Sequence, residues 1–112
     1  MKRFITLLSA GAVALMLSNS VMAGTESSVT AAQIQAAKTP ADHEAIAVAY
    51  DKEAARFDAM AKDHASMSKA YKAAATTQKG MNGAAMGMHC EKLVETYKKA
   101  AEENRQMAAE HR

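Results

Sequence analysis

Between residues 39 and 111, aromatic, histidine and a few other side chains recur at seven-residue intervals, with charged residues between them. We call the contact line between two helices that such a series would form the seam. The first series consists of His43, Tyr50, Phe57, His64 and Tyr71. The second series consists of Cys90, Tyr97, Asn104 and His111. A seven-residue repeat is typical of a helix that packs on another helix at a shallow angle. The pattern therefore predicts an all-α chain built on two long helices.

Local residues indicate where the helices begin. Thr30 and Gln33 have the spacing of a capping box, which predicts a short helix to about residue 38. Thr39 is a favourable cap, and Pro40 suits the first position of a helix because its missing N–H needs no partner there. We expect the first long helix to start at this point.

The end of the first long helix is less sharply marked. Gly80 is the first glycine after Thr39, so the helix should end no later than this residue. Thr76 and Thr77 favour an earlier end, near residues 71–75. We expect helices at about 40–75 and 84–111, joined by a Gly/Met-rich turn, with two glycines softening the second helix up to about residue 88.

The predicted arrangement is an antiparallel helical hairpin with a short preceding helix. A lone hairpin leaves one side of each seam exposed. From residue 24 onward the chain has 23 alanines and one leucine, Leu93, so its core buries little apolar area. Small chains with weak cores commonly need a partner or a metal. We therefore expect two hairpins to dimerise into a four-helix bundle.

The two long helices resemble each other in sequence. Residues 42–64 overlay residues 89–111, with identities at tyrosine, methionine and histidine positions of the seam. In this overlay His43 falls on Cys90. We interpret the pair as one duplicated helix.

The N-terminus has the pattern of a secretory signal peptide, with Lys2 and Arg3 before an apolar run and a small-residue site ending at Ala23. Residues 1–23 are expected to be cleaved, leaving a periplasmic or secreted protein without a stable membrane span. Residues 24–38 form a polar tail and short helix, and residues 39–112 form the hairpin domain. Without Lys2 and Arg3 the 14 basic residues fall to the number of acidic ones, 12, which removes the main support for nucleic-acid binding.

Soft side chains gather beside the predicted turn. Met86, Met88, His89 and Cys90 lie within five residues, and Met86 neighbours His89 and Cys90 on a helix. Thioether, thiolate and imidazole groups suit Cu(I) and, less fully, Zn(II). A lone cysteine cannot form an internal disulfide. Cys90 is therefore a metal ligand, an intermolecular disulfide or a buried thiol.

The end of the first helix decides whether His64 and Met67 join this cluster. If the helix runs to residue 79, His64 lies about 15 Å from Cys90 along the axis. If the helix ends near residue 71, Cys90 faces Met67 and His64 lies about one turn away. In that arrangement His43, at the far end, could meet His111. A histidine on a seam is otherwise a hydrogen-bonded core residue.

Two functions fit these patterns. The first is a small exported protein that binds a soft metal ion, copper above all, for carrying or buffering. Its candidate ligands are Cys90, His89, Met86, Met88, His64 and Met67. The alternative is a non-catalytic structural or interaction protein of the cell envelope, in which the methionines form a contact surface for a homodimer or an envelope partner. No nucleophile–base pair, paired carboxylates or phosphate-binding loop is evident, so we do not expect an enzyme.

Overall fold

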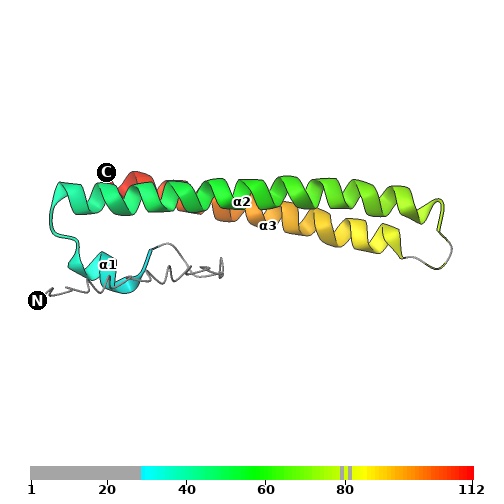
Figure 1. Ribbon diagram of the computed structural model, residues 1–112, viewed down its shortest axis with the longest axis horizontal. Coiled ribbons are helices and arrows are strands. Elements are labelled where there is room, and N and C mark those ends of the chain that lie inside the picture. Colours follow the sequence, from blue (N-terminus) through cyan, green and yellow to red (C-terminus); the bar gives the residue numbers. More distant parts are fainter. Residues whose placement is uncertain (1–28, 79, 81) are drawn as a thin grey trace, which may run out of the picture.

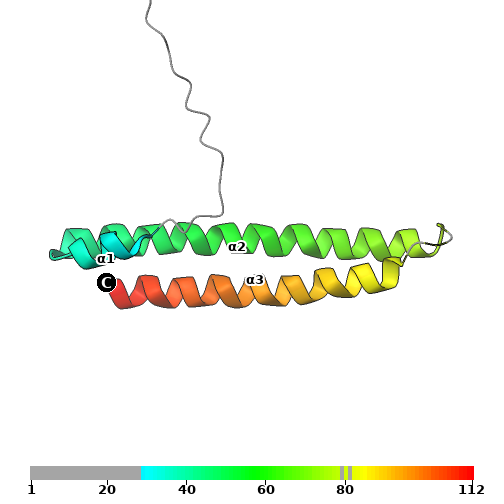
Figure 2. The ribbon, with the colours of Figure 1, turned by 90° about the horizontal axis from the view of Figure 1, so that it is seen from below.

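The structure, a computed structural model, describes residues 29–78, 80 and 82–112. The predicted signal peptide and the tail up to residue 28 lie outside the described residues, as does Met81. Three helices follow in order: α1 (Ala31–Ala36), α2 (Pro40–Ala75) and α3 (Gly83–His111). Helices α2 and α3 run side by side in opposite directions, as Figure 1 shows, and the perpendicular view in Figure 2 agrees. The prediction of an all-α chain with a packed helical hairpin is confirmed.

The start of both α1 and α2 follows from the capping chemistry predicted from the sequence. The Thr30 hydroxyl accepts a hydrogen bond from the backbone N–H of Gln33, and the Gln33 side chain accepts one from the Thr30 N–H. Thr39 and Asp42 form the same reciprocal pair at the start of α2. Each box satisfies backbone donors that the first helical turn leaves unpaired.

The two threonines after α2 explain why the helix ends at Ala75. The hydroxyl of Thr76 donates to the carbonyl of Ala73 at 2.7 Å, and that of Thr77 donates to the carbonyl of Ala74 at 3.3 Å. Side chains that bond the backbone in this way compete with continuation of a helix. Gly80 then takes a positive φ of 83° in the turn, a conformation that favours glycine.

Small residues occupy the centre of the seam between α2 and α3. The most buried residues there are alanines, namely Ala47, Ala54, Ala61, Ala101 and Ala108. The seven-residue series seen in the sequence lies at one edge of this stripe, where most of its rings are half-buried. Alanine lets the two backbones approach closely, so the larger rings pack across the edge and none of the large side chains described is fully buried.

The sequence expectation about α3 is corrected at its start. Its two glycines, at positions 83 and 87, were expected to soften the helix as far as residue 88, yet α3 is regular from Gly83. Both glycines are buried against α2. The absence of a side chain at these positions therefore serves close packing of the two helices.

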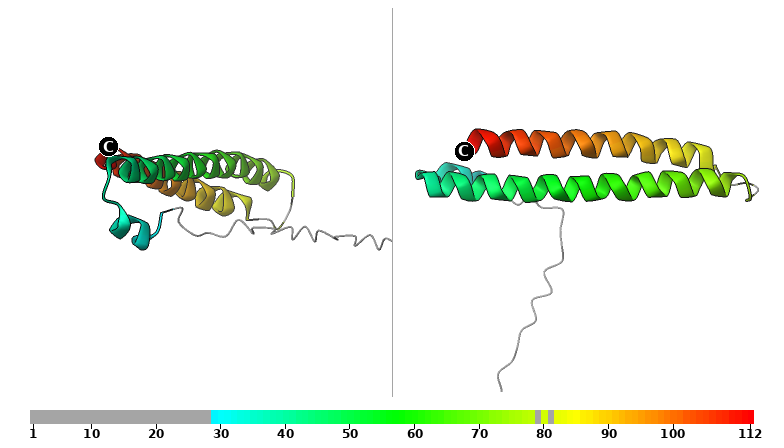
Figure 3. Two further views of the ribbon diagram at one scale, coloured as in Figure 1. Left: turned by 60° about the vertical axis from the view of Figure 1, so that its left-hand side comes forward. Right: turned by 90° about the horizontal axis from the view of Figure 1, so that it is seen from above.

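Helix α1 lies beside the first turns of α2, as the oblique view in Figure 3 shows. Val29, Ala37 and Ile46 are among the residues that line the groove between them. Within the described part of the chain, no helix is both long and apolar enough to cross a membrane.

Candidate functional site

Three contacts between α2 and α3 define the register of the hairpin. The contacting pairs are His43 with His111, Phe57 with Tyr97, and Tyr71 with Gly83. Each pair is displaced from the one before by two heptads forward along α2 and two heptads backward along α3. An antiparallel pair of helices with a constant register produces this spacing. We call the edge that carries these pairs the ladder face.

The same spacing brings His64 opposite Cys90. These two residues lie one heptad beyond the Phe57–Tyr97 pair and one heptad before the Tyr71–Gly83 pair. The register is the one that accompanies the earlier end of α2. The expectation of Met67 opposite Cys90, with His64 about one turn away, is corrected by this position of His64.

Two close approaches of the backbones flank this position on its turn side. A Cβ added to Gly83 would lie 2.3 Å from the carbonyl oxygen of Tyr71, and one added to Gly87 would lie 3.3 Å from that of Ser68. Cys90 follows Gly87 by three residues, so it lies on the same buried side of α3. Its thiol is free, and the residue is only 6% exposed.

His64 carries a buried polar atom without a partner among the described residues. Its ring packs on Tyr97, with centroids 5.3 Å apart, and Tyr97 also packs on Phe57 at 6.1 Å. The Nδ1 atom of His64 is buried and has no hydrogen-bond partner among the described residues. An unsatisfied buried polar atom costs about 1–3 kcal/mol. A ligand bound to this nitrogen would remove that cost.

The methionine candidates and His89 occupy different positions around this pair. Met67 follows His64 by three residues and Met86 precedes Cys90 by four, so each neighbours one member of the pair on its own helix. Both are more than one-third exposed, which leaves their thioethers at the rim. Met88 is 56% exposed and points to the opposite side of α3 from Cys90, while His89 is also exposed.

The structure therefore divides the six predicted ligands. His64 and Cys90 come to one level of the seam with Met67 and Met86 beside them, whereas Met88 and His89 lie outside. Within residues 29–112, excluding 79 and 81, no three His, Cys, Asp or Glu side chains group closely enough to hold a metal ion. A metal at this position would consequently need methionine sulfur or an external ligand in addition to His64 and Cys90.

Ion pairs lie on the other edge of the seam, which we call the charged face. Asp58 pairs with Arg105 and Lys72 pairs with Glu91. Each of these residues directly follows a member of the seven-residue series, so it is turned by about 100° from the ladder face. The hairpin thus has one edge of aromatic, histidine and sulfur-containing side chains and one edge of ion pairs between the two helices.

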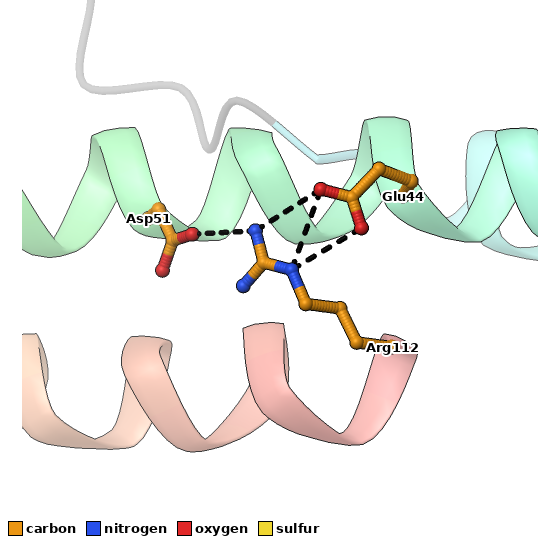
Figure 4. A network of polar contacts seen from close by, with 3 residues as sticks. All are labelled: Glu44, Asp51 and Arg112. Atoms are coloured by element: carbon orange, nitrogen blue, oxygen red, sulfur yellow. Dashed lines mark hydrogen bonds and ion pairs between the residues drawn. The ribbon is translucent and has the colours of Figure 1, made fainter.

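The charged face ends at the free end of the hairpin with Arg112. Its guanidinium contacts Asp51 at 2.8 Å and Glu44 at 3.2 Å, as Figure 4 shows. The hydrogen bonds to Asp51 and then to Glu44 raise the pKa of Arg112 above its ordinary value. Arg112, which directly follows α3, is thereby held against α2.

The ladder face ends at the same place with a histidine pair that was not among the predicted ligands. The Nδ1 atoms of His43 and His111 are 3.1 Å apart, and the ring centroids are 5.4 Å apart. The heptad pattern predicts that His43 and His111 lie on the seam. Whether they lie opposite each other depends on the register of the two helices. In the structure, α2 ends at Ala75 and His43 lies opposite His111.

The arrangement of this chain was compared with known proteins. No known protein family, no curated protein and no solved structure matches it.

Proposed function

We propose that the protein binds a soft metal ion, copper in the Cu(I) state, between His64 and Cys90. The proposal rests on a buried free thiol at Cys90 and a buried imidazole nitrogen without a described partner at His64, two residues that the heptad register puts opposite each other. Thiolate, imidazole and thioether are the ligand types that Cu(I) accepts, and low coordination numbers suit a site with few ligands.

Each group has a role in this proposal. The Cys90 thiolate neutralises the positive charge of the ion, and the nitrogen of His64 supplies a directional bond. Met67 and Met86 complete the coordination from the rim with weak, exchangeable sulfur. A buried pair with an exchangeable rim suits carrying or buffering of the metal, and we propose that role together with export to the periplasm or the cell exterior.

An anaerobic Cu(I) titration tests the proposal. The reduced chain, residues 24–112, competes for the ion with a chromophoric chelator. Cys90→Ser and His64→Gln should each weaken binding by roughly a factor of ten or more, which corresponds to about 1.4 kcal/mol. Met88→Leu and His89→Gln are matched controls that alter the same residue types outside the site. Equal affinity in all four variants would contradict the proposal.

We further propose that two hairpins pair through their ladder faces into a four-helix bundle. Met67, Met86, Leu93 and Met107 are more than one-third exposed in the single hairpin. All four lie three residues after or four before a ladder residue, on the same face. Their exposure supports a partner on this face.

A second copy is the partner that this face fits best. The cross-helix ion pairs lie on the other edge, so the ladder face offers rings and methionines that another ladder face can cover. Sedimentation equilibrium should give a dimer, and Leu93→Glu with Met107→Glu should give a folded monomer. A monomeric wild-type protein at high concentration would contradict this pairing.

An interaction protein of the cell envelope is the second candidate function, favoured by the same exposed methionines. It predicts that Cys90→Ser leaves the binding of a partner unchanged and that no tight Cu(I) binding occurs. The copper titration therefore separates the two functions.

A further inference from the structure

The free end of the hairpin holds a second pair of metal-ligating side chains, separate from Cys90. His43 comes from the first turns of α2 and His111 is the last residue of α3. Their Nδ1 atoms approach to 3.1 Å in a part-buried setting. Without an ion, one neutral ring donates its Nδ1–H and the other accepts it. When both rings carry their proton on Nε2, two lone pairs face the same small space.

The separation of these nitrogens matches that of two ligands on one ion. Imidazole nitrogens bind Zn(II) at about 2.0–2.1 Å. Two such ligands at an angle of about 90–110° would stand about 2.9–3.4 Å apart. The observed 3.1 Å lies within this range.

Charges of both signs surround the pair, because Lys38, Glu44 and Arg112 line a second hollow beside it. Tyr50, Met107 and Glu110 line a hollow together with the two histidines, and the ring of Tyr50 stacks on that of His111 at 5.8 Å. Arg112 would oppose a cation, but its charge is engaged by Glu44 and Asp51 on the charged face. Glu110 adds a negative charge to the hollow from α3.

The duplicated helix gives a second reason for the assignment. In the overlay of the two helices His43 corresponds to Cys90, and His64 corresponds to His111. The histidine pair at the free end is thus the internal counterpart of the His64–Cys90 pair. The exchange of a thiol for an imidazole shifts the preference from soft Cu(I) toward borderline divalent ions.

We propose that His43 and His111 bind one divalent transition ion of the Zn(II) or Ni(II) type through their Nδ1 atoms, with water in the remaining positions. The ion would join the first turn of α2 to the last turn of α3 and close the free end of the hairpin. Two protein ligands make an exchangeable site. This inference does not depend on copper binding at Cys90.

Calorimetric titration with Zn(II) tests the site in the purified protein carrying Cys90→Ser, which removes the competing thiol. We expect one Zn(II) per chain and an increase in melting temperature as the ion binds the folded state. Adding His111→Gln should weaken binding by about tenfold or more. Adding His89→Gln, a change of the same type at an exposed position, should leave affinity within about twofold.

The ring protons of the histidines provide a readout that needs no further variant. In the Cys90→Ser protein, Zn(II) should shift the imidazole resonances of His43 and His111 in equal proportion to the ion added, and leave those of His89 in place. Equal weakening by His111→Gln and His89→Gln would overturn the proposal. Shifts confined to His64 or His89, or the absence of Zn(II) binding, would also overturn it.

Discussion

The two edges of the seam between α2 and α3 hold the helices together in different ways. The ladder face joins them through rings and close backbone contact, as between Phe57 and Tyr97 or Tyr71 and Gly83. The charged face joins them through ion pairs such as Asp58 with Arg105, whose side chains are more than one-third exposed. Buried apolar contact stabilises a fold much more than exposed ion pairs do. The ladder face should therefore determine stability and register.

The largest effect is expected where the backbones are closest. Gly83→Ala would place a Cβ 2.3 Å from the carbonyl oxygen of Tyr71 and 2.8 Å from the Cβ of Ala75, so one helix must move. We expect a loss of about 3 kcal/mol in the free energy of unfolding, measured with urea. Gly87→Ala is the matched control. Its new Cβ would lie 2.9 Å from the flexible side chain of Lys72 and 3.3 Å from the carbonyl oxygen of Ser68, so we expect a smaller loss, partly offset by the gain in helix propensity. Equal losses would contradict the close contact at Gly83.

Removal of a ladder ring should come next. Tyr97→Ala deletes the ring that packs on both Phe57 and His64. Because Tyr97 is half-buried, we expect a loss of about 2 kcal/mol, below the range for a fully buried aromatic residue. Tyr97→Phe keeps the ring and should cost less than about 0.5 kcal/mol. A Tyr97→Ala protein as stable as wild type in urea would show that the ladder face does not hold the hairpin.

The charged face should respond weakly. Arg105→Gln breaks the ion pair with Asp58, and we expect a loss of about 0.5 kcal/mol or less. The difference from wild type should vanish in about 1 M salt, because exposed charges are screened there. A loss comparable to that of Tyr97→Ala, unaffected by salt, would reverse the order of the two faces.

The smallest effect at neutral pH is expected at the start of α2. Hydrogen bonds from the backbone N–H groups of Lys38 and Thr39 lower the pKa of Asp42 below its ordinary value of 3.8. A carboxyl with a lowered pKa in the folded state contributes stability above the unfolded value, and this contribution is lost as pH falls through the folded value. Thermal melts between pH 6 and about pH 2 should therefore fall less steeply for Asp42→Asn than for wild type.

Asp63→Asn is the control for this acid effect, because Asp63 lies exposed in the middle of α2. It should keep the acid dependence of the wild-type protein. Parallel acid curves for wild type and Asp42→Asn would contradict the role of the capping hydrogen bonds.

The sequence predicts the local features of this fold better than the packing of one helix on the other. The capping box at Thr30 and the cap at Thr39 depend on residues close in the chain, so local patterns were sufficient to predict them, and the structure adds the reciprocal contact of Asp42 with the Thr39 N–H. The register of α3 on α2 depends on where α2 ends. Two alternatives were open from the sequence, and the hydroxyl contacts of Thr76 and Thr77 with the backbone accompany the shorter one.

The candidate site could also be predicted only in part from the sequence. Met88 and His89 were chosen for their closeness to Cys90 in the chain, but adjacent positions on a helix point about 100° apart. His64 and Cys90 lie 26 positions apart and are opposite each other only through the register. The repeat of seven contained the information for their pairing, and also for His43 with His111, once the end of α2 was known.

X-ray absorption at the copper edge of the Cu(I)-loaded protein tests the central claim most directly. The account predicts sulfur and imidazole nitrogen together around the ion, with the nitrogen signal lost in His64→Gln and kept in His89→Gln. A spectrum with sulfur alone, or one unchanged by both His64→Gln and Cys90→Ser, would contradict a metal site between α2 and α3.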